Sequence, residues 1–162
     1  MACATRRLKN ESKKWETEFN NENRHMTLLR DTVFIYFMNI GNIKDIIFEV
    51  RCGLPSEYPF KPPKITYNLG NGKKSMTELY KLSRYESAEL KTMNIGMDCL
   101  CCYTILCGDN WDVCLKMVDI GKELERLIKL RQRIRKRMMA RKVQRKEMEI
   151  PSDLWNLIIS YL

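Results

Sequence analysis

The segment GLPSEYPFKPP (53–63) brings three prolines, Pro59, Pro62 and Pro63, into five residues. Proline fixes its own φ angle and has no backbone N–H donor, so neither a helix interior nor a central strand tolerates such a run. Strand-like patterns lie on both sides of it. We therefore expect a connection inside the fold, rather than a PxxP ligand in a disordered stretch.

Three segments predict strands. TVFIYFMNI (32–40) is rich in β-branched and aromatic residues, and DIIFEVRC (45–52) alternates apolar residues with Glu49 and Arg51. A GN dipeptide lies between these two segments, which favours an antiparallel pair. KITYNL (64–69) predicts a third strand. Together they indicate an antiparallel sheet.

Helical patterns flank the predicted strands. Residues 5–20 carry Leu8, Trp15 and Phe19 at helical spacing, which predicts a short amphipathic helix. After Trp111, apolar residues recur mostly at gaps of three and four positions and predict a second helix (Leu115, Val118, Ile120, Leu124, Leu127, Leu130, Ile134 and Met138). The polar stretch 70–91 predicts an inserted loop with at most one or two helical turns.

The net charge of +9 comes from one segment. Arg126 to Lys146 holds 11 of the 29 basic residues and no acidic one, which leaves 18 basic against 20 acidic residues elsewhere. A solvated helix explains this pattern, but clustered Lys and Arg are also typical of phosphate-binding surfaces and of nuclear localisation signals. No aromatic residue is interleaved, so base stacking is not expected.

No apolar run approaches the roughly 18 residues of a membrane span. The opening MACATRRLKNESKK is polar and does not resemble a secretory signal. We expect an intracellular protein, cytoplasmic or nuclear, that does not bind membranes. In a reducing compartment its seven cysteines stay as thiols.

CLCCYTILCGDNW (99–111) concentrates four cysteines within nine residues. Structural zinc sites usually pair cysteine knuckles that lie far apart in sequence, and the single histidine, His25, is remote. Most of these cysteines fit the role of small buried apolar residues. Neither a metal nor another cofactor is expected.

The order of helix, antiparallel strands, YPFKPP turn, thiol segment, tryptophan and helix resembles the ubiquitin-conjugating enzyme family over roughly residues 5–128. EVRCGLPSEYPFKPPKI is similar to that family's strand and proline-rich turn. The family places an asparagine eight residues before its catalytic cysteine and a tryptophan about nine residues after it. Asn94 and Trp111 have these spacings from Cys102. The resemblance implies an α+β fold with Cys102 as the nucleophile.

The activity that this resemblance implies is acyl transfer. Cys102 would accept ubiquitin, or a ubiquitin-like modifier, as a thioester from an activating enzyme and yield it to a lysine amine. Asn94 would stabilise the charge that develops on the carbonyl oxygen. Asp109 or Asp112 is the candidate acid that orients or deprotonates the lysine.

The same resemblance implies two partner surfaces. Phe60 and Pro62 are similar to the turn that the family presents to RING-type ligases. Arg6, Arg7 and Lys9 resemble the first-helix surface that engages the activating enzyme.

Two departures from the family pattern support alternatives. Thr92-Met93 stands where the family has His-Pro, and the family's C-terminal pair of helices has no counterpart. One alternative is a catalytically inactive scaffold of the same fold for ubiquitin-ligase assemblies. The other is a nucleic-acid-associated protein that acts through the basic segment 126–146.

We expect three parts along the chain. The ubiquitin-conjugating core covers 1–128, including the inserted loop, and a basic helical extension covers 129–148. A short amphipathic helix covers 149–162. This last segment either packs back onto the core or resembles the first helix of an F-box, the element that docks on a cullin-ligase adaptor.

Overall fold

The computed structural model describes residues 2–38, 48–68, 73–75, 80–93, 100–102 and 104–146. The predictions for Asn94 and for the terminal helix in 149–162 lie outside the described residues. The architecture is α+β, as predicted. In chain order the elements are α1 (Ala2–Glu18), β1 (Arg24–Leu29), β2 (Thr32–Phe37), β3 (Phe48–Gly53), β4 (Lys64–Asn68), β5 (Lys73–Ser75), α3 (Arg84–Thr92), the 3-10 helix η1 (Gly108–Asn110) and α4 (Met117–Lys146).

The strands form one antiparallel sheet in the order β1-β2-β3-β4-β5. The three predicted strands are confirmed as β2, β3 and β4. Ile35 pairs with Val50 across β2 and β3, so the alternating apolar residues of both strands are buried on one face. β1 was not predicted, because Met26 is the only one of its residues that is buried.

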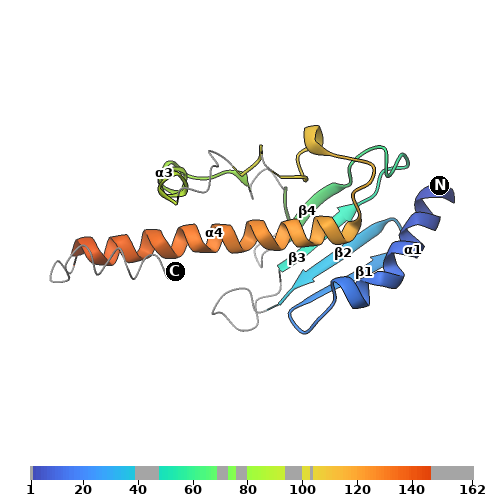
Figure 1. Cartoon of the computed structure of the whole chain (residues 1–162), viewed down its shortest axis with the longest axis horizontal. Coiled ribbons are helices and arrows are strands. Elements are labelled where there is room, and N and C mark those ends of the chain that lie inside the picture. Colours follow the sequence, from blue (N-terminus) through green and yellow to red (C-terminus); the bar gives the residue numbers. More distant parts are fainter. Residues whose placement is uncertain are drawn as a thin grey trace.

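The predicted helix after Trp111 is confirmed as α4, which runs across the sheet and continues past its edge (Figure 1). Ile120 and Leu124 are fully buried and belong to the same apolar cluster as Ile35 and Val50. This apolar contact is the main interaction that holds α4 on the sheet, since burial of apolar area dominates folding free energy.

Gly121 allows α4 to lie close to Phe19, which follows α1, and to Met26 of β1. A Cβ atom at this position would lie 2.5 Å from the Phe19 ring and 3.0 Å from the Met26 side chain. Phe19 and Met26 are themselves almost completely buried. The absence of a side chain at Gly121 therefore makes room for the Phe19 ring against α4.

The stretch predicted as an inserted loop contains β5 and α3. Ser83 is the N-cap of α3: its hydroxyl accepts a hydrogen bond from the Glu86 amide, and the Glu86 carboxylate accepts one from the Ser83 amide. Such a capping box favours helix formation even where the apolar periodicity is weak. Apolar periodicity alone predicted at most one or two helical turns here, fewer than α3 has.

Ion pairs join α3 to the part of α4 that extends beyond the sheet. Each of two α3 glutamates pairs with two α4 arginines, with N–O distances of 2.9 to 3.7 Å (Glu86 with Arg131 and Arg135, Glu89 with Arg137 and Arg141). Burial raises the pKa of Glu86, but the Ser83 hydrogen bonds and the nearby arginines outweigh burial and hold that pKa below its ordinary value. The expected boundary between 128 and 129 falls inside this continuous helix.

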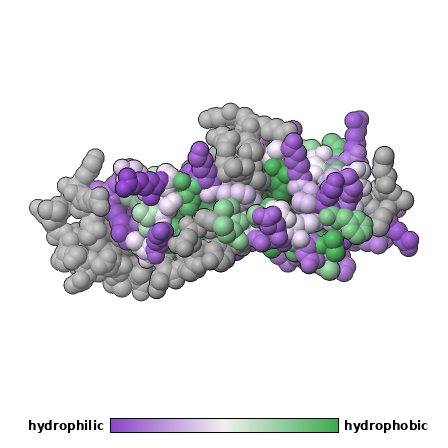
Figure 2. Space-filling model, turned by 90° about the horizontal axis from the view of Figure 1, so that it is seen from above, coloured by the Kyte–Doolittle hydropathy of each residue, from purple (hydrophilic) through white to green (hydrophobic). Residues whose placement is uncertain are grey.

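In the coloured part of the face seen from above, hydrophilic side chains lie between several separate groups of hydrophobic residues (Figure 2). No helix within the described part of the chain is long and apolar enough to cross a membrane.

We expect Glu89→Gln to loosen α3 from α4. Glu89 is 5% exposed and binds Arg137, which is 15% exposed, so the substitution removes a largely buried ion pair between α3 and α4. The second pair of Glu89, with Arg141, is more exposed and contributes less. We therefore expect the packing of α3 against α4 to lose about 2 kcal/mol of stability. Hydrogen exchange of the α3 amides measures the effect. As a control, Glu57→Gln removes the exposed pair with Lys61 and should leave α3 protection unchanged. Equal protection in both variants would contradict this role of Glu89.

Candidate functional site

Cys102 lies on the segment that leads from α3 to η1, and its side chain is exposed. Leu100 and Thr104, two positions away on either side, are fully buried. Cys101 is half-buried, and its Sγ atom lies 3.7 Å from Cys102 Sγ. Buried side chains thus anchor the segment on both sides of an exposed thiol.

Two other cysteines are in environments that disfavour the reactive thiolate. Cys52 is fully buried in β3, and burial raises the pKa of its thiol to about 12. Cys114 is exposed, but its hydrogen bond to the Asp112 carboxylate and the charge of that carboxylate raise its pKa. The thiolate is the form that attacks an acyl group. Cys52 and Cys114 are therefore poorer nucleophile candidates.

Asn110 fixes the backbone around Cys102. Its side-chain Nδ2 donates hydrogen bonds of 3.0 Å to both the Cys102 and the Thr104 carbonyl oxygens. Asn110 was not among the residues predicted from the sequence. The available signal was the polar GDN sequence, because Asn side chains commonly bond to nearby backbone in turns.

The two candidate acids have different surroundings. Asp109 is exposed and lies in η1, next to Asn110. Asp112 is also exposed, and its Oδ1 accepts a hydrogen bond of 2.7 Å from the Cys114 amide. That hydrogen bond lowers the pKa of Asp112, which makes it a weaker base. Asp109 is therefore the better candidate of the two.

Trp111 ties the thiol segment to the proline-rich turn. The indole Nε1 donates a hydrogen bond of 2.8 Å to the Pro59 carbonyl, and the ring centroid lies 6.2 Å from that of the buried Tyr58. These contacts join parts of the chain that are 52 positions apart. The YPFKPP turn and the cysteine segment are thus held side by side.

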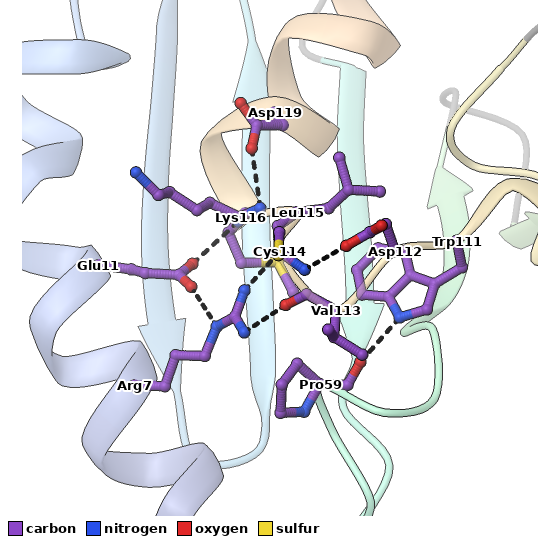
Figure 3. A network of polar contacts seen from close by, with 11 residues as sticks. Arg7, Glu11, Pro59, Trp111, Asp112, Val113, Cys114, Leu115, Lys116 and Asp119 are labelled. Atoms are coloured by element: carbon purple, nitrogen blue, oxygen red, sulfur yellow. Dashed lines mark hydrogen bonds and ion pairs between the residues drawn. The ribbon is translucent and has the colours of Figure 1, made fainter.

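Arg7 and Glu11 connect α1 to the loop that follows Trp111 (Figure 3). Arg7 donates hydrogen bonds of 2.5 and 2.6 Å to the carbonyls of Val113 and Leu115. Glu11 accepts one of 2.8 Å from Arg7 and one of 2.9 Å from the Met117 amide, at the start of α4. A carboxylate is favourable there because the N-terminus of a helix carries unpaired N–H groups and a partial positive charge.

This network gives Arg7 an internal structural role that the sequence analysis missed. The i, i+4 spacing of Arg7 and Glu11 was a visible signal for such a pair. The side chains of Arg6 and Lys9 are exposed on α1.

A groove of about 770 Å³ lies between α1, the proline-rich turn and the loop before α4. Its lining includes Arg6, Lys14, Phe60, Val113 and Lys116. Phe60 is 74% exposed, which is unusual for so large an apolar side chain.

Of the predicted partner-binding residues, Arg6, Arg7 and Phe60 line this groove. Pro62 and Lys9 are exposed and are not part of the lining.

Within the described ranges, no group of three or more His, Cys, Asp or Glu side chains could hold a metal ion.

Comparisons with protein-family models, with curated proteins and with solved structures found no match to this chain.

We expect an alkylating reagent to modify Cys102 much faster than Cys52 in the native protein. Cys102 is exposed, whereas Cys52 is sealed in the sheet and its pKa is raised to about 12. Timed labelling with a maleimide, followed by peptide mass spectrometry, measures both rates. Unfolding in denaturant should bring the two rates together. If both thiols react equally slowly before unfolding, the exposed position of Cys102 is wrong.

We expect Glu11→Gln to destabilise the fold by about 2 kcal/mol, because it removes the charge that pairs with Arg7 and caps α4. For a chain of this size the melting temperature should fall by about 4–8 °C. Glu16→Gln, an exposed glutamate on the same helix, is the matched control and should melt like the wild type. Equal melting temperatures for the two variants would show that the Glu11 contacts do not stabilise the fold.

Proposed function

We propose that the chain is an acyl carrier of the ubiquitin-conjugating type, with Cys102 as the thioester-forming residue. The observation that carries this proposal is the exposed Cys102 thiol on a segment with buried anchors at Leu100 and Thr104. A nucleophile that accepts a protein-sized acyl group must be accessible, and its backbone must be held in place.

The surroundings of Cys102 support the same function. Asn110 holds the Cys102 carbonyl, and Trp111 joins this segment to the proline-rich turn. Phe60 in that turn is exposed beside a groove. An acyl carrier must exchange its group with other proteins, and an exposed aromatic next to basic side chains is a suitable docking surface for them.

The proposed reaction has two steps. In the first, the Cys102 thiolate attacks the thioester between the modifier and the activating enzyme, forms a new C–S bond and releases the enzyme's thiolate. In the second, a neutral lysine amine attacks the Cys102 thioester. The C–S bond then breaks, the Cys102 thiolate leaves, and the lysine nitrogen loses a proton to a base as the amide forms.

The residues that assist the second step stay predictions. Asn94 would donate its amide N–H to the oxyanion, and Asp109 would accept the proton or orient the amine. Asp112 is less suited to this role, because the Cys114 amide already holds its carboxylate.

A catalytically inactive scaffold of the same fold is the second candidate. Some members of the family carry an Asp where this chain has Thr104, and Thr104 is fully buried with its hydroxyl accepting a hydrogen bond from the Leu106 amide. Together with the Thr92-Met93 substitution, this leaves fewer polar groups to assist the amine. A scaffold would use the groove at Phe60 and not the thiol.

We expect wild-type protein to form an adduct with ubiquitin when it is incubated with activating enzyme and ATP, and a thiol reductant should remove that adduct. Cys102→Ser should give an oxygen ester that resists reductant but is cleaved by hydroxide. Cys101→Ser is the matched control, and its adduct should stay reducible. Gel electrophoresis of the wild type and both variants, with and without reductant or hydroxide, shows which adducts are cleaved.

Two outcomes would contradict the assignment. If Cys101→Ser abolishes the adduct and Cys102→Ser does not, the nucleophile is the neighbouring thiol. If the wild type accepts neither ubiquitin nor a related modifier, the scaffold is the better description.

A further inference from the structure

Two sets of basic residues on α4 have different surroundings. One set faces α3 and is paired with Glu86 and Glu89, as described above. The other set lies on a different face and is exposed. We call this second set the basic stripe (Lys122, Arg126, Lys129, Arg133 and Lys136).

The stripe has the spacing of a single helix face. Its members follow one another at alternating steps of four and three residues, which keeps them within a narrow angular range. The buried residues Ile120, Leu124 and Leu127 lie on the opposite side, against the core. At 1.5 Å per residue, the stripe places one positive charge per helical turn over roughly 21 Å.

Little within the described residues neutralises these charges. Arg126 pairs with Glu123 and Lys129 with Glu125, but both basic side chains are exposed, at 41% and 69%. The Lys129–Glu125 pair is exposed and contributes little, whereas Arg126 binds both carboxylate oxygens of Glu123, so a phosphate can replace Glu125 more readily than Glu123.

Arg133 and Lys136 form no ion pair with any residue that the structure describes. The sequence of α4 beyond Glu125 holds no acidic residue.

A straight row of cations with regular spacing matches a polyanion that is itself linear and regular. Nucleic acids have this property, because their phosphates repeat every few ångströms along the strand. A membrane fits less well, since surface-bound helices insert apolar side chains beside their basic ones. From Lys122 to Lys136, the described structure exposes no large hydrophobic side chain.

We propose that the basic stripe binds the phosphate backbone of a nucleic acid without reading its sequence. No aromatic residue lies in α4, so contacts to phosphate and not to bases provide the affinity. This inference is independent of the acyl-transfer proposal, since Cys102 lies outside α4. It assigns phosphate binding to five side chains, four of which lie in the basic segment 126–146, and it assigns the arginines that face α3 to the fold.

The test is binding of the full chain to a fluorescent duplex of about 30 base pairs with an arbitrary sequence, measured over a range of salt concentrations. If all five stripe residues contact phosphate, log K should fall against log salt with a slope of roughly −4 to −5. The double variant Arg133→Gln, Lys136→Gln should bind about tenfold more weakly, with a slope smaller by about 2.

The matched control is Lys13→Gln, Lys64→Gln, which removes the same charge from exposed positions on α1 and β4. It should bind nearly as well as the wild type. An equal loss in both double variants would show that net charge alone drives binding and would overturn the proposal. No binding at low salt, or binding to phosphatidylserine vesicles without binding to duplex or single-stranded DNA, would overturn it as well. Binding by Cys102→Ser should equal that of the wild type, even if the acyl-transfer assay fails.

Discussion

The Glu11 carboxylate, which binds both the Arg7 guanidinium and the first amide of α4, is the interaction on which the arrangement of this protein depends. Apolar burial holds α4 on the sheet but is not directional. Hydrogen bonds are directional, and those of Glu11 fix where α4 begins relative to α1. Because Arg7 also holds the carbonyls of Val113 and Leu115, the same network fixes the loop between the thiol segment and α4.

The candidate site is built from contacts between side chains and backbone. Asn110 holds the carbonyl of Cys102, and Trp111 holds that of Pro59. These bonds satisfy carbonyl groups in segments that belong to neither helix nor strand, where unpaired polar groups are costly once buried. An exposed thiol and an exposed Phe60 thereby lie on segments that the interior of the protein holds firmly.

The long helix α4 has a different environment at each end. Its first half packs on the sheet through apolar residues, whereas its second half extends beyond the sheet and is held by the α3 glutamates. Four of its arginines form ion pairs with Glu86 and Glu89. The five residues of the basic stripe face away from the core, so positive charge is concentrated on one exposed face of the helix.

The sequence by itself determined β2, β3, β4 and the apolar face of α4, because the period of apolar residues records which side of each element is buried. The resemblance to the ubiquitin-conjugating family predicts Cys102 as the nucleophile, and the structure leaves that thiol exposed. Tertiary structure alone decided the partners of polar groups. Glu11 accepts a hydrogen bond from the Met117 amide, 106 positions away, and Glu89 pairs with Arg137 and Arg141 of α4. No local pattern encodes such choices, since they depend on which segments the folded chain brings together. Only the folded chain separates the arginines that stabilise α3 from the basic residues left open to solvent.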